Sequence, residues 1–173
     1  MSAVVIMGPS GCGKTTLGKD LARHLGWRFV EGDDLHPRAN IEKMSSGMAL
    51  DDYDRQPFLH NVGKALAKYE PEGVVAACSA LKKSYRDLIR DYVPGVLFIL
   101  PPSSRDVLLE NMAIRGDHFM PTSLLDSQLA DLELPDDNEN ILLLANGVTT
   151  EAALQEVRRF LPDQGGGVNP SAS

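Results

Sequence analysis

A lysine and two hydroxyl residues follow a glycine-rich turn near the start of the chain. The stretch GPSGCGKT, residues 8–15, fits the pattern G-x-x-x-x-G-K-[ST], and the apolar run AVVIM precedes it directly. Glycines let backbone N–H groups turn inward around phosphate oxygens, and a helix that begins at the lysine adds its positive N-terminal end. The pattern predicts a polyphosphate loop in which Lys14 reaches the β- and γ-phosphates and the Thr15 hydroxyl ligates Mg²⁺.

The nucleotide contacts expected from this loop come from the loop residues and the first turn of the helix. They are Gly8, Ser10, Gly11, Cys12, Gly13, Lys14, Thr15 and Thr16. We interpret Cys12 as a small residue that fills a small space, because nothing nearby indicates a reactive thiol. ATP and Mg²⁺ are the ligands that such a loop holds in kinases.

Acidic residues follow the second apolar run, in FVEGDDLHP. Glu31, Asp33, Asp34 and His36 fall where a second strand is expected to end, next to the phosphate loop. Ligands of open α/β sheets bind at that edge. An acid there could orient an acceptor hydroxyl and take its proton, or hold Mg²⁺ through water. A solvated turn that caps the next helix suits Asp34 well, and it suits Asp33 less.

Two cationic segments are expected at the same edge. Arg55, in DDYDRQPF, has no helix-capping reason for its place and is a candidate to bind a substrate carboxylate. Lys82, Arg86 and Arg90 are spaced by four and predict one basic stripe along a helix, with Lys82 and Arg86 nearest the site. The third strand does not end in the acid that many phosphate-loop ATPases use for Mg²⁺, which favours a small-molecule kinase over a motor or a switch.

The segment IRGDHFMP has the composition of a mobile lid. A Gly-Asp turn lies between two expected helices and is flanked by Arg115 and His118. Small kinases close such a lid over the phosphates and exclude water. Arg115 is therefore a candidate to neutralise charge on the transferred phosphoryl group.

Alternating apolar runs and helical patterns place these residues on an α/β fold, with a parallel sheet between helices. Strands are expected at 3–7, 28–31, 74–77, 96–100 and 141–144. Helices are expected at 14–25, 36–44, 55–69, 80–91, 104–115, 122–132 and 150–160, the last with Thr150 as its N-cap. One kinase domain is expected over 1–162, with a lid over about 111–135 and a disordered Gly/Ser-rich tail over 163–173.

Composition narrows the class of protein. A formal net charge of −7 argues against a general nucleic-acid or membrane-surface binder, because such proteins carry a basic face. Cys12 and Cys78 form no disulfide framework or metal-type spacing. No apolar run or leader-like start indicates a membrane span or secretion. These features predict a cytoplasmic protein.

Several motifs together resemble the gluconokinase family of small phosphate-loop kinases. They are GDDLHP, the Asn40 and Lys43-Met44 spacing, DYDRQPFL, CSALKKSYRD, HFMP, and the later Ser127-Gln128 and Leu132-Glu133 pairs. They run in unbroken order from about residue 4 to residue 135, and CSALKKSYRD with HFMP is far more specific than the loop alone.

The resemblance implies a three-layer fold similar to shikimate and adenylate kinases, and ATP-dependent phosphorylation of D-gluconate at its 6-hydroxyl. It also implies a homodimer and a role in the pentose phosphate or Entner–Doudoroff route. Carried onto matching positions, it makes Asp33 the base. The expected gluconate contacts are His36, Arg55, Lys82 and Arg86, with Arg115 and His118 on the lid side.

Three positions depart from the family pattern. Cys12 stands where serine is usual, and Phe58 stands where tryptophan is usual, which we expect to change only packing. Asn111 replaces an arginine one helical turn before Arg115, so Arg115 is expected to carry more of the lid's positive charge.

Two other functions stay open from the sequence. One is a kinase of a different small acceptor, such as shikimate or a nucleoside monophosphate, although His36, Lys82 and Arg86 follow the gluconate pattern. The other is a nucleotide-binding protein without turnover, which the replacement at Asn111 keeps in view.

Overall fold

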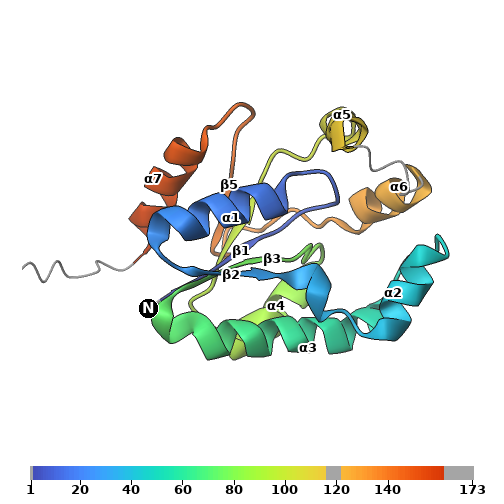
Figure 1. The fold of residues 1–173 in the computed structure, drawn as a ribbon, viewed down its shortest axis with the longest axis horizontal. Helices are drawn as coiled ribbons and strands as arrows, with labels where there is room; N and C mark the ends of the chain where they lie inside the picture. Colours follow the sequence, from blue (N-terminus) through green and yellow to red (C-terminus); the bar gives the residue numbers. More distant parts are fainter. Residues whose placement is uncertain (1, 116–121, 162–173) are drawn as a thin grey trace, which may run out of the picture.

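A five-stranded parallel sheet forms the centre of the computed structural model, which describes residues 2–115 and 122–161 (Figure 1). The strands are β1 (Ala3–Ile6), β2 (Arg28–Glu31), β3 (Val74–Ala77), β4 (Leu97–Leu100) and β5 (Ile141–Leu143). Their order is β2-β3-β1-β4-β5, so β1 lies in the middle, with Val5 beside Ala76 of β3 and Phe98 of β4.

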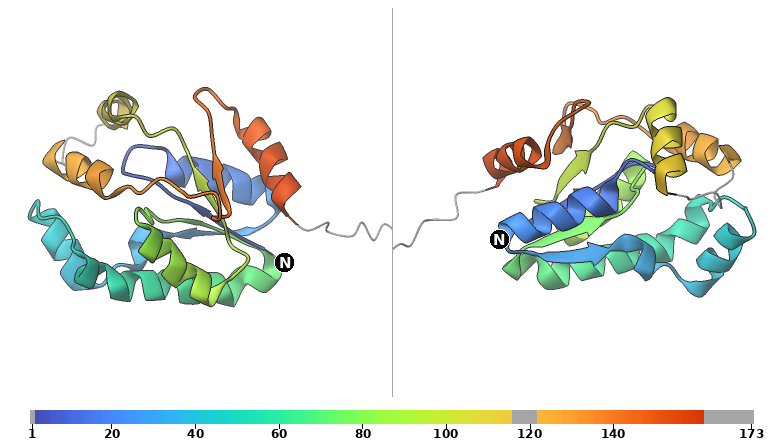
Figure 2. Two further views of the ribbon diagram at one scale, coloured as in Figure 1. Left: turned by 180° about the vertical axis from the view of Figure 1, so that it is seen from behind. Right: turned by 45° about the horizontal axis from the view of Figure 1, so that its top comes forward.

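Helices cover both faces of this sheet. The α-helices of the described residues are α1 (Lys14–Leu25), α2 (Arg38–Ser45), α3 (Asp52–Tyr69), α4 (Lys83–Tyr92), α5 (Arg105–Arg115), α6 (Thr122–Asp131) and α7 (Thr150–Phe160). Two short 3-10 helices are η1 (Gly32–Leu35) and η2 (Glu70–Glu72). Helices α1 and α7 lie on one face, and α3 and α4 lie on the other (Figures 1 and 2).

Alternation along the strands divides the core into two parts. Val5 and Phe98 pack against α3 and α4, whereas Val4 and Ile6 pack against α1 and α7. Every residue of β1, β3 and β4 is buried, as expected for strands covered on both faces. A third, smaller apolar cluster joins α5 and α6 to the phosphate loop.

The structure confirms the five strands and the α/β class, and differs at several element ends. Helix α3 begins three residues earlier than predicted, because Asp51 and Asp54 form a reciprocal capping box. Helix α4 begins at Lys83, because residues 78–82 form an irregular turn in which Ala80 has a positive φ of 43°. The N-cap of α7 is Thr149 rather than Thr150. Within the described residues, no helix is both long and apolar enough to cross a bilayer.

A close approach of backbones fixes the turn that follows β2. A Cβ atom built on Gly32 would lie 2.1 Å from the carbonyl oxygen of Ala77 at the end of β3. Only glycine permits that contact. The chain therefore enters η1 directly against the sheet edge, and Asp33 and His36 follow there.

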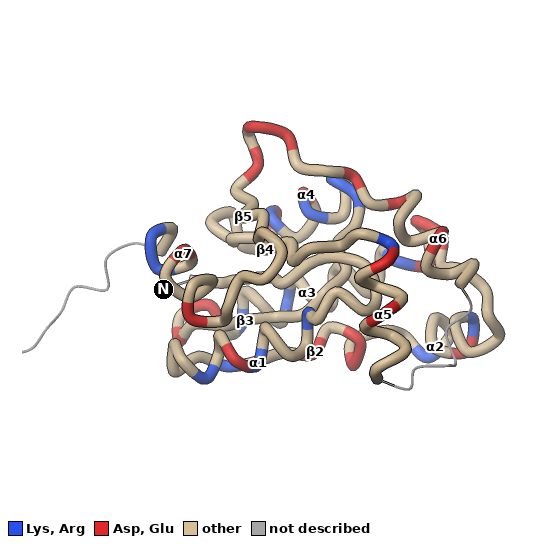
Figure 3. Tube along the Cα trace, turned by 90° about the horizontal axis from the view of Figure 1, so that it is seen from above, with Lys and Arg blue, Asp and Glu red and all other residues tan. Residues whose placement is uncertain are grey.

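A buried ion cluster ties α4 to the segment before β5. Arg86 is fully buried and forms two hydrogen bonds of 2.8 Å to the carboxylate of Glu139, whose side chain is only 3% exposed. Arg90 adds a third bond of 2.8 Å to Glu139. Figure 3 shows this acidic segment between α6 and β5 running beside the basic α4. Arg86 and Arg90 of the predicted basic stripe thus converge on one buried carboxylate.

We predict that Glu139→Gln destabilises the fold by about 3–5 kcal/mol, because it leaves the buried Arg86 charge without its counter-charge. Urea denaturation followed by circular dichroism measures the change. The matched control is Glu156→Gln, which removes the exposed pair with Arg159 and should cost less than about 1 kcal/mol. Equal losses in the two variants would contradict the structural role of the cluster.

The Glu139 carboxylate also leads us to expect that the stability of the fold depends on pH. Hydrogen bonds from Arg86 are the main cause that lowers the pKa of Glu139 from 4.5 to about 2. A lowered pKa in the folded state contributes stability that is complete above about pH 4.5 and is lost as the pH falls toward about 2. The stability difference between the wild type and Glu139→Gln should therefore stay constant at higher pH and shrink below about pH 4.5. A difference that grows on acidification would contradict this assignment.

Candidate active site

The phosphate loop lies at the carboxyl end of the central strand β1. Its glycines Gly8, Gly11 and Gly13 have φ values of 125°, 86° and 88°, which other residues rarely adopt. The N–H of Gly8 donates to the carbonyl of Ser79, 3.0 Å away, and so anchors the loop to the turn after β3. Helix α1 begins at Lys14, directly behind the loop, so the backbone is arranged for an anion.

Two side chains complete the loop. The Lys14 ammonium donates to the carbonyl of Pro9 at 3.0 Å and thus lies against its own loop. The Thr15 hydroxyl donates to the Glu31 carboxylate at 2.6 Å. Glu31, at the end of β2, therefore stands beside the hydroxyl predicted to ligate Mg²⁺. The sequence placed Glu31 among the acids at this edge that could hold Mg²⁺ through water, but it did not single out Glu31 for that part.

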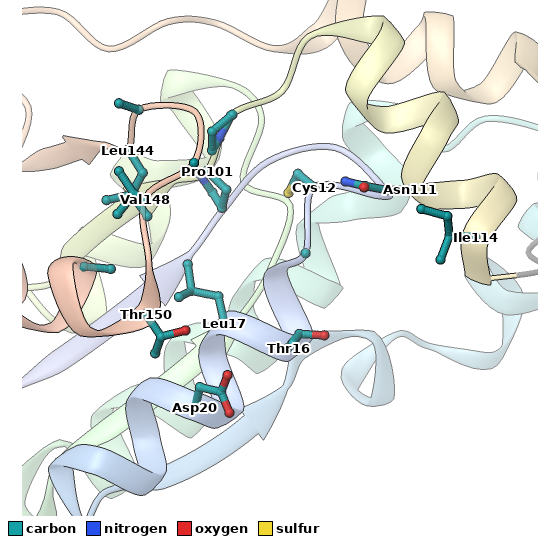
Figure 4. Close-up of a pocket in the computed structure, with 15 residues that line it drawn as sticks. Cys12, Thr16, Leu17, Asp20, Pro101, Asn111, Ile114, Leu144, Val148 and Thr150 are labelled. Carbon is teal, nitrogen blue, oxygen red and sulfur yellow. The ribbon is translucent and has the colours of Figure 1, made fainter.

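Cavities open on both sides of the loop. One, of about 380 Å³, is bounded by Gly13 and Thr16 of the loop side, by Asn111 of α5, and by Pro101 and Val148 after β4 and β5 (Figure 4). The other, of about 980 Å³, begins at Ser10, Gly11 and Lys14 and extends toward η1, α2 and α3. The loop therefore separates a smaller chamber from a larger one.

The larger cavity brings together three of the predicted substrate residues. Asp33 comes from η1, His36 follows it, and Arg55 comes from the second turn of α3; all three line this cavity with Lys14. Phe58 lines it as well and stacks on the His36 ring, with centroids 3.7 Å apart and planes 11° apart. Phe58 is a buried core residue, as expected of a packing residue, and its packing also shapes the cavity wall beside His36.

Arg55 is held by acidic and phenolic partners. One of its nitrogens donates to Tyr85 at 2.9 Å and to Asp131 of α6 at 3.0 Å, and its side chain is 13% exposed. Burial lowers the pKa of Arg55, but the hydrogen bonds with Tyr85 and Asp131 outweigh burial and raise it. The guanidinium is thus fixed at the cavity wall with donors remaining. Asp131 was not foreseen, because no short motif marks a partner 76 residues away in sequence.

Lys82 and Arg86 lie outside this cavity. Lys82 is the N-cap of α4 and pairs with Asp52 at 2.9 Å, at 4.0 Å from Asp131. Arg86 donates to the carbonyls of Ala80 and Leu81 at 3.2 and 3.0 Å, in addition to Glu139. Arg86 therefore stabilises the irregular turn next to Ser79, and the expectation that it contacts substrate is not supported.

Helices α5 and α6 attach to the phosphate loop by amide groups and a small apolar cluster. Asn111 donates to the carbonyl of Gly11 at 2.7 Å, and the N–H of Ser10 donates to the Gln128 side chain at 2.7 Å. The apolar cluster consists of Cys12, Leu108, Met112 and Leu125. Cys12 is thus a packing residue, as expected. Gln128 stood in the sequence only as part of a motif, with no role attached to it.

The two lid candidates cannot be placed. Arg115 is the last residue of α5, but its side chain lies outside the described part of the structure, as does all of His118. Their roles stay predictions. The other loop residues precede α1, and Thr16 lies in its first turn. Gly13 and Thr16 line the smaller cavity, whereas Ser10 and Gly11 line the larger one, and their nucleotide contacts stay predictions.

Comparison with known proteins adds independent information. The family model described as shikimate kinase matches residues 10–120. A probable gluconokinase of Schizosaccharomyces pombe is 48% identical over 143 residues, covering 78% of this chain and 74% of the relative. A gluconokinase of Gluconobacter oxydans is 44% identical over 159 residues, covering 90% and 89%. The crystal structure of a gluconokinase from Sinorhizobium meliloti is 42% identical with a TM-score of 0.82, covering 92% and 90%.

These findings agree with the geometry around the loop. The shikimate kinase model covers most of the phosphate loop and strands β2, β3 and β4, whereas the high identities extend over most of the chain and concern gluconokinases. The structure has a phosphate loop with a cavity on each side of it, and the identity to gluconokinases extends over most of the sequence. The chain therefore belongs to the gluconokinase family of phosphate-loop kinases.

Proposed function

We propose that this protein transfers the γ-phosphoryl group of ATP to the 6-hydroxyl of D-gluconate, giving 6-phosphogluconate and ADP. The observation that carries the proposal is the larger cavity, where Asp33, His36 and Arg55 meet beside Lys14. A sugar acid has one carboxylate and several hydroxyls. Arg55 offers a fork of donors for the carboxylate, and Asp33 offers an acceptor for a hydroxyl proton.

The nucleotide is assigned to the phosphate loop and the smaller cavity. The apolar wall of that cavity includes Leu17 and Val148, which suit a flat base, and its polar side meets the loop at Gly13. A Cβ atom on Gly13 would meet nothing within 4 Å, so the backbone there is open to a ligand. The Thr15 hydroxyl and Glu31 beside it are the groups suited to Mg²⁺ and its water ligands. When bound, Mg²⁺ neutralises charge on the phosphates.

The chemical step is an in-line displacement in this proposal. The 6-oxygen of gluconate forms a bond to the γ-phosphorus as the bond from that phosphorus to the ADP oxygen breaks, and the hydroxyl proton passes to Asp33. Because the transition state is loose, positioning and charge stabilisation by Lys14 and the loop N–H groups outweigh proton removal. The proposed lid spans about residues 111–135, from the last turns of α5 through α6, with Arg115 and His118 on it.

Three further assignments rest on the family resemblance and on the composition of the chain. We propose a homodimer, a cytoplasmic location and a place in sugar-acid metabolism such as the pentose phosphate route. Both cysteines are free and buried, which suits a reducing compartment, and burial raises the pKa of Cys78 to about 12, so that this thiol is unreactive. Light scattering of the purified protein tests the dimer.

A substrate panel tests the function. ADP release at fixed Mg·ATP should be fast with gluconate and near background with shikimate, with a nucleoside monophosphate and with no acceptor. A preference for another acceptor would replace gluconate in the proposal. ATP binding without turnover on any acceptor would show a protein that has lost catalysis.

We predict that Asp33→Asn lowers kcat by about 100-fold or more, because the neutral amide aligns the acceptor hydroxyl less firmly than the carboxylate and cannot take its proton. ATP affinity should stay within about threefold, since Asp33 lines the acceptor chamber and not the smaller one. Coupled ADP release and calorimetric ATP titration measure the two quantities. Near-normal turnover in this variant would remove Asp33 from the role.

We predict that Arg55→Ala raises the gluconate KM by about tenfold or more, because a charge-assisted hydrogen bond to the carboxylate is lost. The ATP KM should change little. Arg38→Ala is the control, because Arg38 on α2 is 92% exposed and pairs only with Glu42 in the described structure. An unchanged gluconate KM for Arg55→Ala would mean that the carboxylate is bound elsewhere.

A further inference from the structure

Asn40 is a buried polar residue for which the proposed reaction has no use. It lies in the first turn of α2, is 4% exposed, and is one of three buried polar or charged residues in the described structure. Its amide nitrogen lies 2.8 Å from the carbonyl oxygen of Asp54 and 3.3 Å from Nδ1 of His36. A buried amide is costly unless its hydrogen bonds are made, so this arrangement constrains its neighbours.

The contact with Asp54 decides which way the amide faces. A backbone carbonyl can only accept a hydrogen bond, so the side-chain atom at 2.8 Å must be the NH₂ group of Asn40. That NH₂ group has a second hydrogen, and its neighbour is Nδ1 of His36 at 3.3 Å. A donor at this position requires Nδ1 to be unprotonated, and a neutral imidazole then carries its proton on Nε2.

The ring is also fixed in orientation. Phe58 stacks on it at a centroid distance of 3.7 Å, and with Nδ1 engaged by Asn40 the nitrogen left for a molecule in the cavity is Nε2. The charged groups around it are Asp33 of η1, Arg55 of α3, and the Lys43–Asp54 pair joining α2 to α3. Burial, the largest effect, lowers the pKa of His36; Asp33 opposes it and Arg55 adds to it, so the ring is neutral at neutral pH.

We propose that Asn40 is a positioning residue that holds His36 in its neutral tautomer with the proton on Nε2, so that His36 donates a hydrogen bond to an oxygen of the acceptor and does not take a proton from it. The proposal rests on the proposed function only in making the larger cavity the acceptor site. It gives three residues of that site different roles. His36 is a fixed neutral donor, Arg55 a charged donor, and Asp33 the proton acceptor.

A nuclear magnetic resonance experiment tests the tautomer without any activity. Long-range ¹H–¹⁵N correlation spectra of the ¹⁵N-labelled wild type at about pH 7.5 distinguish the two neutral tautomers and the imidazolium. The His36→Gln spectrum identifies the His36 signals among the four histidines. We expect a protonated Nε2 and a bare Nδ1. A protonated Nδ1, or protons on both nitrogens, would overturn the proposal whether or not the protein phosphorylates gluconate.

Asn40→Asp gives the second readout. A carboxylate beside Nδ1 attracts a proton to that nitrogen and raises the pKa of His36. Below the raised pKa the imidazolium still donates from Nε2, but above it Nε2 becomes bare. We therefore expect the gluconate KM of this variant to rise by about fivefold or more, the loss of one hydrogen bond, as the pH increases from about 6 to 9. The wild-type KM should stay flat from about pH 7 to 9, because its neutral tautomer does not change there.

Matched variants separate positioning from folding. Asn61→Asp is the control, because Asn61 is exposed and its amide also donates to a backbone carbonyl, that of Leu35; its KM profile and His36 signals should match the wild type. Asn40→Ala leaves Nδ1 without its donor and should show a mixture of tautomers. A single Nε2 tautomer in Asn40→Ala, or equal KM profiles in Asn40→Asp and Asn61→Asp, would remove Asn40 from the role.

Discussion

Burial of β1 on both faces is the constraint on which the site depends. Val4 and Ile6 pack under α1 and α7, and Val5 packs under α3 and α4, so the strand is fixed from both sides. Its carboxyl end therefore presents the phosphate loop at a fixed place between β3 and β4. Inward-facing N–H groups are effective for an anion only when they are held before the ligand arrives. The sheet does this for the loop.

Helices α5 and α6, which lie over the phosphate loop, are not held by the two large apolar clusters that fix β1. Helices α5 and α6 share with Cys12 an apolar cluster that is separate from the two large ones, and they reach the loop backbone through Asn111 and Gln128. Their position thus depends on few contacts, several of them to the residues that would surround the phosphates. A ligand on the loop and the placement of these helices are linked through those contacts, which is the physical basis for the proposed lid.

An acidic protein that binds anions needs cationic side chains at the binding site, and neighbouring groups must hold those side chains in place. With a net charge of −7, it places Lys14 and Arg55 on the larger cavity and restrains Arg55 with Asp131 and Tyr85. Arg86 shows the other use of a cation, as the buried centre of the connection between α4 and Glu139. The two arginines have similar chemistry and different tasks because their partners differ.

The sequence alone determined the strands, the phosphate loop, and the gathering of Asp33, His36 and Arg55 at the carboxyl edge of the sheet. These features could be predicted because strand burial, glycine conformation and parallel topology act over short stretches of chain. Only the tertiary structure decided which cations face the cavity. The spacing predicted one basic stripe of Lys82, Arg86 and Arg90, with the first two nearest the site. In the structure Arg86 and Arg90 bind a carboxylate 53 and 49 residues away, and Lys82 pairs with Asp52. The tautomer proposed for His36 likewise depends on Asn40 and Asp54, which meet only when α2 packs on α3. Hydrogen bonds between distant segments leave no periodic signal in a single sequence, so the folded chain alone specifies them.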